Sequence, residues 1–228
     1  MPAYFSLTTV FNRKDIYPDF TNDFYNHLIK CGLKFKSGYY DDKKLSLREI
    51  ISWNQRKLEN NFHLGMNEHY SNGYKQILFN FCDFKEVRGY WDNNSPTDDE
   101  FTFSIIFPEH NLVEDYSTTP ITLNKKIKMI QDLAISIWEF EVVQSLQTSW
   151  ELGDNIPVSL EYVKNGELPT IEPFAIIPKE YVTQLQSTTF TQTEVPKNGV
   201  LLHEPPAPRE PKFLSPFGHI VKFFKYLF

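Results

Sequence analysis

The residues best suited to chemistry form one short cluster, HLGMNEH, which contains His63, Glu68 and His69. Zinc proteases place two histidines at i and i+4 on one helix, with a glutamate beside the first. Here the two histidines are six residues apart, a glycine lies between them and they follow the end of an expected helix. We therefore expect an ordinary exposed loop and no metal site.

The two cysteines, Cys31 and Cys82, are the candidate thiol nucleophiles. Any histidine could activate either one, because such partners meet in space rather than in sequence. Neither cysteine has the spacing of a metal or redox motif, so we expect both to be buried structural thiols. The chain also lacks G-x-x-x-x-G-K-[ST], G-x-G-x-x-G and G-x-S-x-G. It therefore indicates no cofactor and no recognised class of enzyme.

Acidic residues are concentrated in the middle of the chain. The whole chain has a formal net charge of -6, and no lysine or arginine lies between Arg88 and Lys125. Dense like charges repel one another, and they can select a partner of opposite charge. The pattern fits a solvated acidic face or a docking surface for a basic protein. The candidate docking residues are Asp92, Asp98, Asp99, Glu100, Glu109, Glu114 and Asp115.

Two other partners are not expected for this stretch. The run DNNSPTDDE at 92–100 lacks the glycine and the spaced acceptors of a calcium loop. Nucleic acid requires a basic surface, so it is an unlikely match for an acidic one.

The elements that position these residues follow from hydrophobic periodicity. Aromatic and β-branched residues predict strands at 4–11, 73–84, 86–91 and 101–107. The last two strands flank the acidic run and predict an antiparallel hairpin with negative charge at its tip. In the final strand one face is expected to carry Phe101, Phe103, Ile105 and Phe107.

Helical spacing of apolar residues predicts helices over 19–33, 46–62 and 122–147. Ser46 and Glu49 form a capping box at the start of the second. Beyond Gly153, short strands are expected at 157–169 and 172–178, followed by a hairpin with a glycine turn over 188–204.

These elements predict an α+β fold: an antiparallel sheet with helices mainly on one face, a strand-rich C-terminal part and a tethered C-terminal helix. Residues 1–204 are expected to form a single domain. The aromatic content of 16% suits a packed core and disfavours disorder. A proline-rich connector follows at 205–216.

The last segment, 217–228, is expected to be an amphipathic helix that begins near Ser215 and Pro216. Its apolar stripe contains Phe217, Ile220, Val221 and Phe224. Such a stripe should be buried, and three places remain open for it. It could dock on its own domain, on a second chain (including another copy in a homodimer) or peripherally on a membrane.

The compartment is inferred from missing signals. The first fifteen residues lack a basic start followed by an apolar run, which disfavours a secretory peptide. No apolar stretch reaches the ~18 residues of a membrane span. We therefore expect a cytoplasmic protein.

In size, charge and overall sequence character the whole chain resembles the immunity proteins of bacterial polymorphic-toxin systems. Those proteins are small, without leader peptides, often acidic and of α+β fold, and they block a cognate toxin without catalysis. The resemblance implies a non-catalytic protein that binds a basic toxin domain. The alternatives are an enzyme of an unrecognised type and a structural subunit of a larger assembly.

Overall fold

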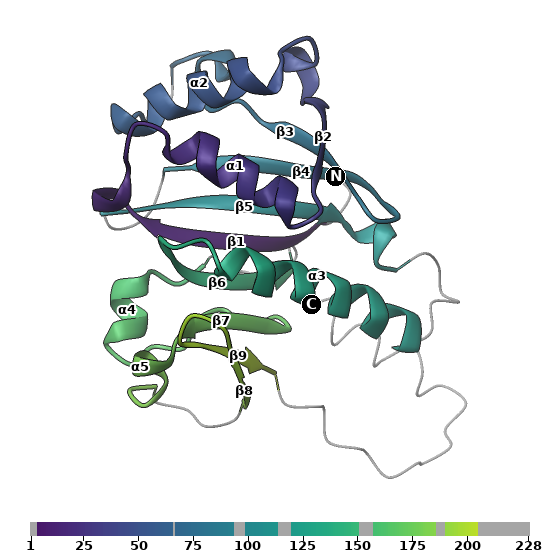
Figure 1. The fold of residues 1–228 in the computed structure, drawn as a ribbon, viewed down its shortest axis with the longest axis vertical. Coiled ribbons are helices and arrows are strands. Elements are labelled where there is room, and N and C mark those ends of the chain that lie inside the picture. The colour runs from purple at the N-terminus through teal and green to yellow at the C-terminus, as the bar shows by residue number, and fades with distance from the viewer. Residues whose placement is uncertain are drawn as a thin grey trace.

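The computed structural model describes residues 4–65, 67–93, 99–113, 120–150, 157–185 and 190–204. These residues form an α+β fold on one antiparallel sheet, which confirms the predicted fold class (Figure 1). The described strands run in the order β2-β3-β4-β5-β1-β6-β7-β9-β8. They are β1 (Tyr4–Asn12), β2 (Lys34–Gly38), β3 (Ile77–Phe81), β4 (Phe84–Asp92), β5 (Glu100–Pro108), β6 (Val143–Trp150), β7 (Phe174–Pro178), β8 (Thr191–Val195) and β9 (Gly199–His203).

Within the described residues, three longer helices and two short ones accompany the sheet. They are α1 (Phe20–Lys30), α2 (Leu47–Glu59), α3 (Pro120–Trp138), α4 (Leu160–Lys164) and α5 (Lys179–Val182), with 3-10 turns at Arg13–Asp15, Tyr40–Asp42, Tyr70–Asn72 and Glu109–Asn111. Side chains of α1 and α3 belong to the same buried cluster as the aromatic face of β1 and β5, so both helices cover one face. Within the described ranges, none of the helices combines the length and apolar character needed to cross a bilayer.

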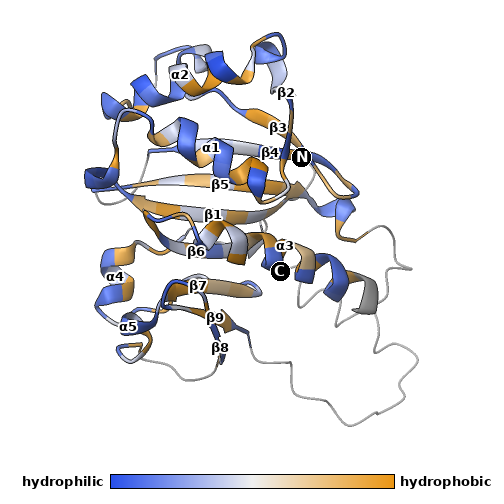
Figure 2. Ribbon diagram, viewed as in Figure 1, coloured by the Kyte–Doolittle hydropathy of each residue, from blue (hydrophilic) through white to orange (hydrophobic). Residues whose placement is uncertain are grey.

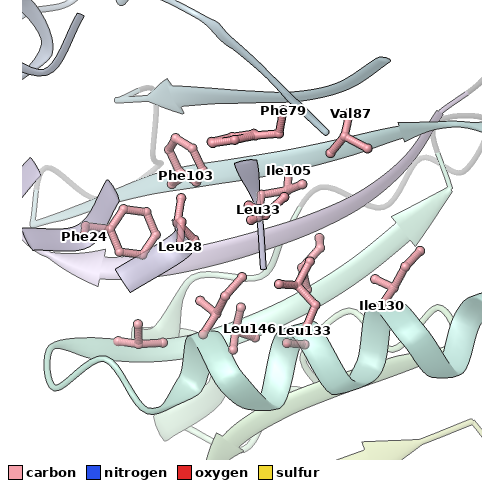
Figure 3. Close-up of a cluster of buried hydrophobic side chains, with 14 of the residues drawn as sticks. Phe24, Leu28, Leu33, Phe79, Val87, Phe103, Ile105, Ile130, Leu133 and Leu146 are labelled. Atoms are coloured by element: carbon pink, nitrogen blue, oxygen red, sulfur yellow. The ribbon is translucent and has the colours of Figure 1, made fainter. Parts of the chain in front are cut away.

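Aromatic side chains at alternate positions of β1 and β5 form the centre of the core. The strand register places Phe11 opposite Phe101, and their stacked rings lie 5.3 Å apart between centroids. From α1, Phe24 meets Phe103 edge-on at 5.2 Å (Figure 3). Phe103 is fully buried, and so are the other members of the predicted face: Phe101, Ile105 and Phe107. The alternation of the sequence therefore fixes which face of the sheet is covered.

The predicted capping box at the start of α2 is confirmed. The Ser46 backbone N–H donates to Glu49 Oε2 at 2.7 Å, and the Glu49 backbone N–H donates to Ser46 Oγ at 3.3 Å. The hydrogen bonds from Ser46 lower the pKa of the Glu49 carboxyl. In Figure 2 the α2 ribbon alternates between hydrophilic and hydrophobic residues, as expected for a helix with one buried side.

The third long helix is shorter than its apolar spacing predicts. α3 ends at Trp138 and β6 begins at Val143, so the predicted helix over 122–147 is wrong for residues 139–147. β6 pairs with β1, with Leu146 opposite Thr9. The apolar residues of this segment fit either structure, and pairing with a central strand decides between them.

The reverse error occurs at 157–169, where the predicted strand contains the short helix α4. Ser159 starts this helix, because its hydroxyl accepts the backbone N–H of Glu161 at 3.3 Å. Gly166 follows the helix with a φ of 96°. Strand β2 carries little sequence signal, because the exposed Lys34 and Lys36 break up its apolar pattern. Lysines are common on edge strands, where they oppose pairing with other chains.

The predicted β8–β9 hairpin is confirmed, although glycine does not make its turn. Lys197 and Asn198 adopt the left-handed φ values, 56° and 53°. Gly199 is required for a different reason, since a Cβ atom there would lie 2.7 Å from Cε2 of Trp138. The Trp138 indole N–H donates to the Pro196 carbonyl oxygen at 2.8 Å. These contacts tie the hairpin to the end of α3.

Gly89 in β4 provides a test of core packing. A Cβ atom at this position would lie 2.6 Å from Phe103 Cζ and 2.8 Å from Phe79 Cε2. We expect Gly89→Ala to lower the free energy of unfolding by about 1–3 kcal/mol through overpacking, measured by urea denaturation. Gly65→Ala is the matched control, because its Cβ would come no closer than 3.5 Å to Glu68. Equal stabilities of the two variants would contradict this packing.

His203 provides a test of pH dependence. Its Nε2 lies 2.8 Å from Gln131 Nε2 of α3, and burial, with a smaller effect of Lys128, lowers the pKa of His203. The unfolded chain binds a proton at this residue near pH ~6.5, whereas the folded chain resists it. Stability should therefore fall as the pH drops below about 6.5.

We expect His203→Gln to lose part of the difference in urea midpoint between about pH 7.5 and about pH 5.5. The same substitution at the exposed His110 is the control. A wild-type difference retained in the His203 variant would mean that other groups cause it.

Candidate functional site

The acidic residues predicted to form one surface lie at different ends of the β4–β5 hairpin. Asp92 ends β4, and Asp99 lies beside the end of β1, where its carbonyl oxygen accepts the Arg13 backbone N–H at 2.7 Å. Glu109 begins a 3-10 turn at the far end of β5. Because a strand of 9 residues spans roughly 30 Å, Glu109 is remote from Asp92 and Asp99.

Glu100 is buried, so its predicted place on an exposed acidic surface is wrong. Its side chain is only 7% exposed. Oε1 accepts the Ser159 hydroxyl at 3.1 Å, and Oε2 accepts the Leu160 backbone N–H at 3.2 Å. The carboxylate therefore satisfies the first turn of α4, where free N–H groups need acceptors.

Several predicted site residues lie outside the described residues. They are Asp98, Glu114 and Asp115 of the acidic stretch, and Phe217, Ile220, Val221 and Phe224 of the predicted docking helix. The connector 205–216 lies outside them as well. The roles of these residues stay predictions.

Around Asp92 the fold forms a cavity of about 500 Å³. Its walls come from the Tyr40–Asp42 turn, the segment after α2, residues 70–76 and the end of β4. We name it the aromatic–acidic cavity for the residues Tyr39, Tyr40, Tyr70, Tyr74, Trp91, Asp41, Asp42 and Asp92. Among the described residues that line it there is no lysine or arginine.

The turn after β2 positions the first two acids. A Cβ atom at Gly38 would lie 2.8 Å from the carbonyl carbon of Asp42, so glycine allows the turn to fold back this closely. Asp42 Oδ1 forms a salt bridge with Lys75 Nζ at 2.8 Å. Asp41 Oδ2 accepts the hydroxyl of Tyr70 at 2.5 Å, and this bond raises the pKa of Tyr70.

Hydrogen bonds from distant segments hold the inner wall. Asn93 is 3% exposed. Its Nδ2 donates to Asn61 Oδ1 at 2.9 Å and to the Phe62 carbonyl oxygen at 3.0 Å, while its Oδ1 accepts the Arg13 guanidinium. Tyr74 donates its hydroxyl to the same Phe62 oxygen at 3.1 Å, and burial raises the pKa of Tyr74 to about 12. The cavity is therefore fixed by the fold before any ligand arrives.

The lining is rich in acceptors and aromatic faces. Gln76 Oε1 is buried at the cavity and has no hydrogen-bond partner within the described part of the chain. Asp41 and Asp92 add carboxylates, and the tyrosine and tryptophan rings add negative π-faces. Cations with N–H donors bind well to both kinds of group. The arrangement therefore suits a cationic group, such as an arginine or lysine side chain.

Nucleophilic catalysis finds little support at this cavity. Ser71 Oγ lies 2.8 Å from His69 Nδ1, but the same Nδ1 accepts the Ser71 backbone N–H at 3.3 Å. This contact is the cap of the Tyr70–Asn72 turn. In the residues that the structure describes, no three His, Cys, Asp or Glu side chains meet in a way that could hold a metal ion.

The cysteines also lie apart from the cavity lining. Cys31 is half-buried, and burial raises its pKa to about 11, which disfavours the reactive thiolate. Cys82 is exposed in the turn between β3 and β4, so its predicted burial is wrong. Its φ of 49° places it in the left-handed region typical of tight turns.

Of the predicted acidic residues, Asp92 lines the cavity, whereas its other two acids, Asp41 and Asp42, were not predicted. Both lie in the first part of the chain, where lysines and arginines outnumber the acids, so the local net charge does not reveal an acidic cluster. The available signal is the run YYDD at 39–42, which places two large aromatic side chains beside two acids.

No protein-family model matches this chain, and no curated protein matches its sequence. Among solved structures, the Pseudomonas aeruginosa T6SS protein PA0821 is similar with a TM-score of 0.36 and 9% sequence identity. The alignment covers 88% of this chain and 65% of that one, so this chain spans less than two thirds of that protein's length. A likeness this distant carries no argument about function.

The burial of Glu100 generates a prediction. We expect Glu100→Ala to lower the free energy of unfolding by about 1–3 kcal/mol, because the buried Leu160 N–H and Ser159 hydroxyl lose their acceptor. The neighbouring Asp99→Ala removes an exposed carboxylate and should stay within about 0.5 kcal/mol of the wild type. Urea denaturation compares the two variants. Wild-type stability of both would show that the Glu100 contacts are unimportant.

Proposed function

We propose that this protein is a non-catalytic binding protein that neutralises a basic toxin domain, as an immunity protein does. The supporting observation is the aromatic–acidic cavity, in which carboxylates and aromatic rings converge. Lys75 at Asp42 and Arg13 at Asn93 contact its wall residues but are not among the described residues that line it. A basic partner would insert one cationic side chain there. The partner's remaining positive charge would face the overall negative charge of this chain, -6.

Such a cavity can anchor an interface. Tyrosine, tryptophan and arginine are the residue types that dominate measured interface energies, and they act best in preformed, desolvated pockets. A cation over an aromatic face contributes about 0.5–2 kcal/mol. Complementary charge mainly raises the association rate, whereas buried charge pairs slow dissociation. An inhibitor of a toxin gains from both effects, because it must capture its target quickly and keep it.

The exposure of two tyrosines in the cavity wall also supports a binding role. Tyr40 and Tyr70 are 65% and 57% exposed, which is unusual for large aromatic side chains unless they contact something. Both belong to short 3-10 turns rather than to the sheet. These rings are therefore available to a protein partner at the cavity mouth, while Trp91 lies at its base, only 3% exposed.

The proposal predicts a gene for a basic toxin domain beside the gene for this chain, and binding is tested with that domain. We expect the double variant Asp41→Asn, Asp92→Asn to associate about tenfold more slowly at low ionic strength, measured by stopped-flow fluorescence or surface plasmon resonance. The difference should shrink as salt screens the charges over roughly 8–10 Å.

The matched control is the double variant Asp83→Asn, Asp132→Asn, which removes two exposed acids that do not line the cavity. It should retain most of the wild-type rate, because its net charge changes equally while the cavity stays intact. Equal slowing by both variants would mean that net charge alone steers binding, and no slowing by either would reject the proposed contact.

A further inference from the structure

A second cavity, of about 480 Å³, opens on the face of the sheet turned away from α1 and α2. Arg88 of β4 lies on this face, since its neighbours Val87 and Gly89 point into the core. Strand pairing places Leu78 and Ile106 beside Arg88 on the same face. The cavity lies on the surface of the β2–β5 half of the sheet, where no described helix of the core cluster covers it.

The Arg88 side chain is held in place by aromatic rings. Its guanidinium carbon lies 4.6 Å from the ring centroid of Tyr39 and 5.3 Å from that of Tyr4. Its Nε is buried and has no hydrogen-bond partner among the described residues. No carboxylate of the described chain lies within the 4.0 Å of an ion pair with it. Stacked rings position the planar group but supply no acceptor for its N–H donors.

The buried Nε–H of Arg88 has lost its hydrogen bond to water, and no described residue replaces that bond. Loss of water from a charged group is unfavourable unless hydrogen bonds or opposite charge replace it. The planar fork of arginine matches two oxygens of a carboxylate or phosphate at once. The orientation of Arg88, open to the cavity and fixed by two rings, is what such an anion needs.

The charged residues around the second cavity also favour an anionic ligand. Lys36 and Lys43 also line it, and Glu86 is the carboxylate among the described lining residues. Both lysines are exposed and can turn their ammonium groups toward a bound anion. The local excess of positive charge contrasts with the negative net charge of the whole chain, so it is a property of this site.

We propose that this second cavity binds an oxyanion, with Arg88 donating two hydrogen bonds and Lys36 and Lys43 supplying the remaining positive charge. The ligand chemistry is a carboxylate or a phosphate group. It is carried either by a small phosphorylated molecule or by an acidic side chain of a protein partner. The site is separate from the proposed cation-binding function, although the two cavities share Tyr39 and Tyr40 as a common wall.

The experiment follows the Arg Nε–Hε signal of Arg88 by nuclear magnetic resonance at constant ionic strength. Inorganic phosphate and N-acetylglutamate amide are the two probes. We expect a saturable shift of this signal with at least one probe, and at least a fivefold weaker affinity in the double variant Lys36→Gln, Lys43→Gln. Saturation with phosphate alone identifies a phosphate site, and saturation with the glutamate probe alone identifies a protein carboxylate.

The control is Lys85→Gln, which removes an exposed lysine of the same strand that does not line the cavity. It should keep the wild-type affinity for the probe. A second variant, Arg88→Met, lacks this signal, so probe binding to it is followed by the backbone amide shift of Leu78, which also lines the cavity. That shift saturates in the wild type and should not saturate in Arg88→Met, and the urea midpoint establishes whether the variant remains folded. The proposal is overturned if neither probe saturates the wild-type signal, or if Lys85→Gln weakens binding as much as the double variant does.

Discussion

The hydrogen bond between the Trp91 indole N–H and the Tyr25 hydroxyl, 3.0 Å long, is the contact on which the rest of the structure depends. Tyr25 of α1 also accepts Asn54 Nδ2 of α2 at 3.2 Å. Asn54 in turn exchanges two hydrogen bonds, of 2.7 and 2.9 Å, with the backbone of Lys75. Because these groups are buried, leaving one unpaired would cost about 1–3 kcal/mol. The bonds therefore fix the sheet, two helices and the wall of the aromatic–acidic cavity as one unit.

The turn at 39–42 connects this framework to both proposed sites. Tyr39 and Tyr40 line both cavities, whereas Asp41 and Asp42 line the first cavity and not the second. Tyr39 also stacks on the Arg88 guanidinium, while Asp42 is paired with Lys75. The acids of this turn and the lysines Lys36 and Lys43 thus line different cavities. This separation lets a protein of negative net charge offer a positive site without mutual neutralisation.

Much of the fold could be predicted because local interactions decide it. The capping box of α2 and the alternating aromatic residues of β5 depend on neighbours a few positions apart, and both predictions are confirmed. The boundary between α3 and β6 was not predictable in the same way, because Leu146 suits a helix or a strand until β1 pairs with it. The helix α4 similarly depends on Glu100, a residue about sixty positions away that accepts the Leu160 N–H.

The sequence by itself determined the α+β class, the excess of acids and the positions of β1, β5, α1 and α2. Only the tertiary structure decided which acids act together. Asp99 and Glu100 are adjacent in sequence, yet Asp99 is exposed in the turn before β5, whereas Glu100 is buried against the start of α4. Asp41 and Asp92 are far apart in sequence, yet they line one cavity. Charge in a sequence is counted along the chain, whereas a binding site is assembled by strand pairing and helix packing between distant segments.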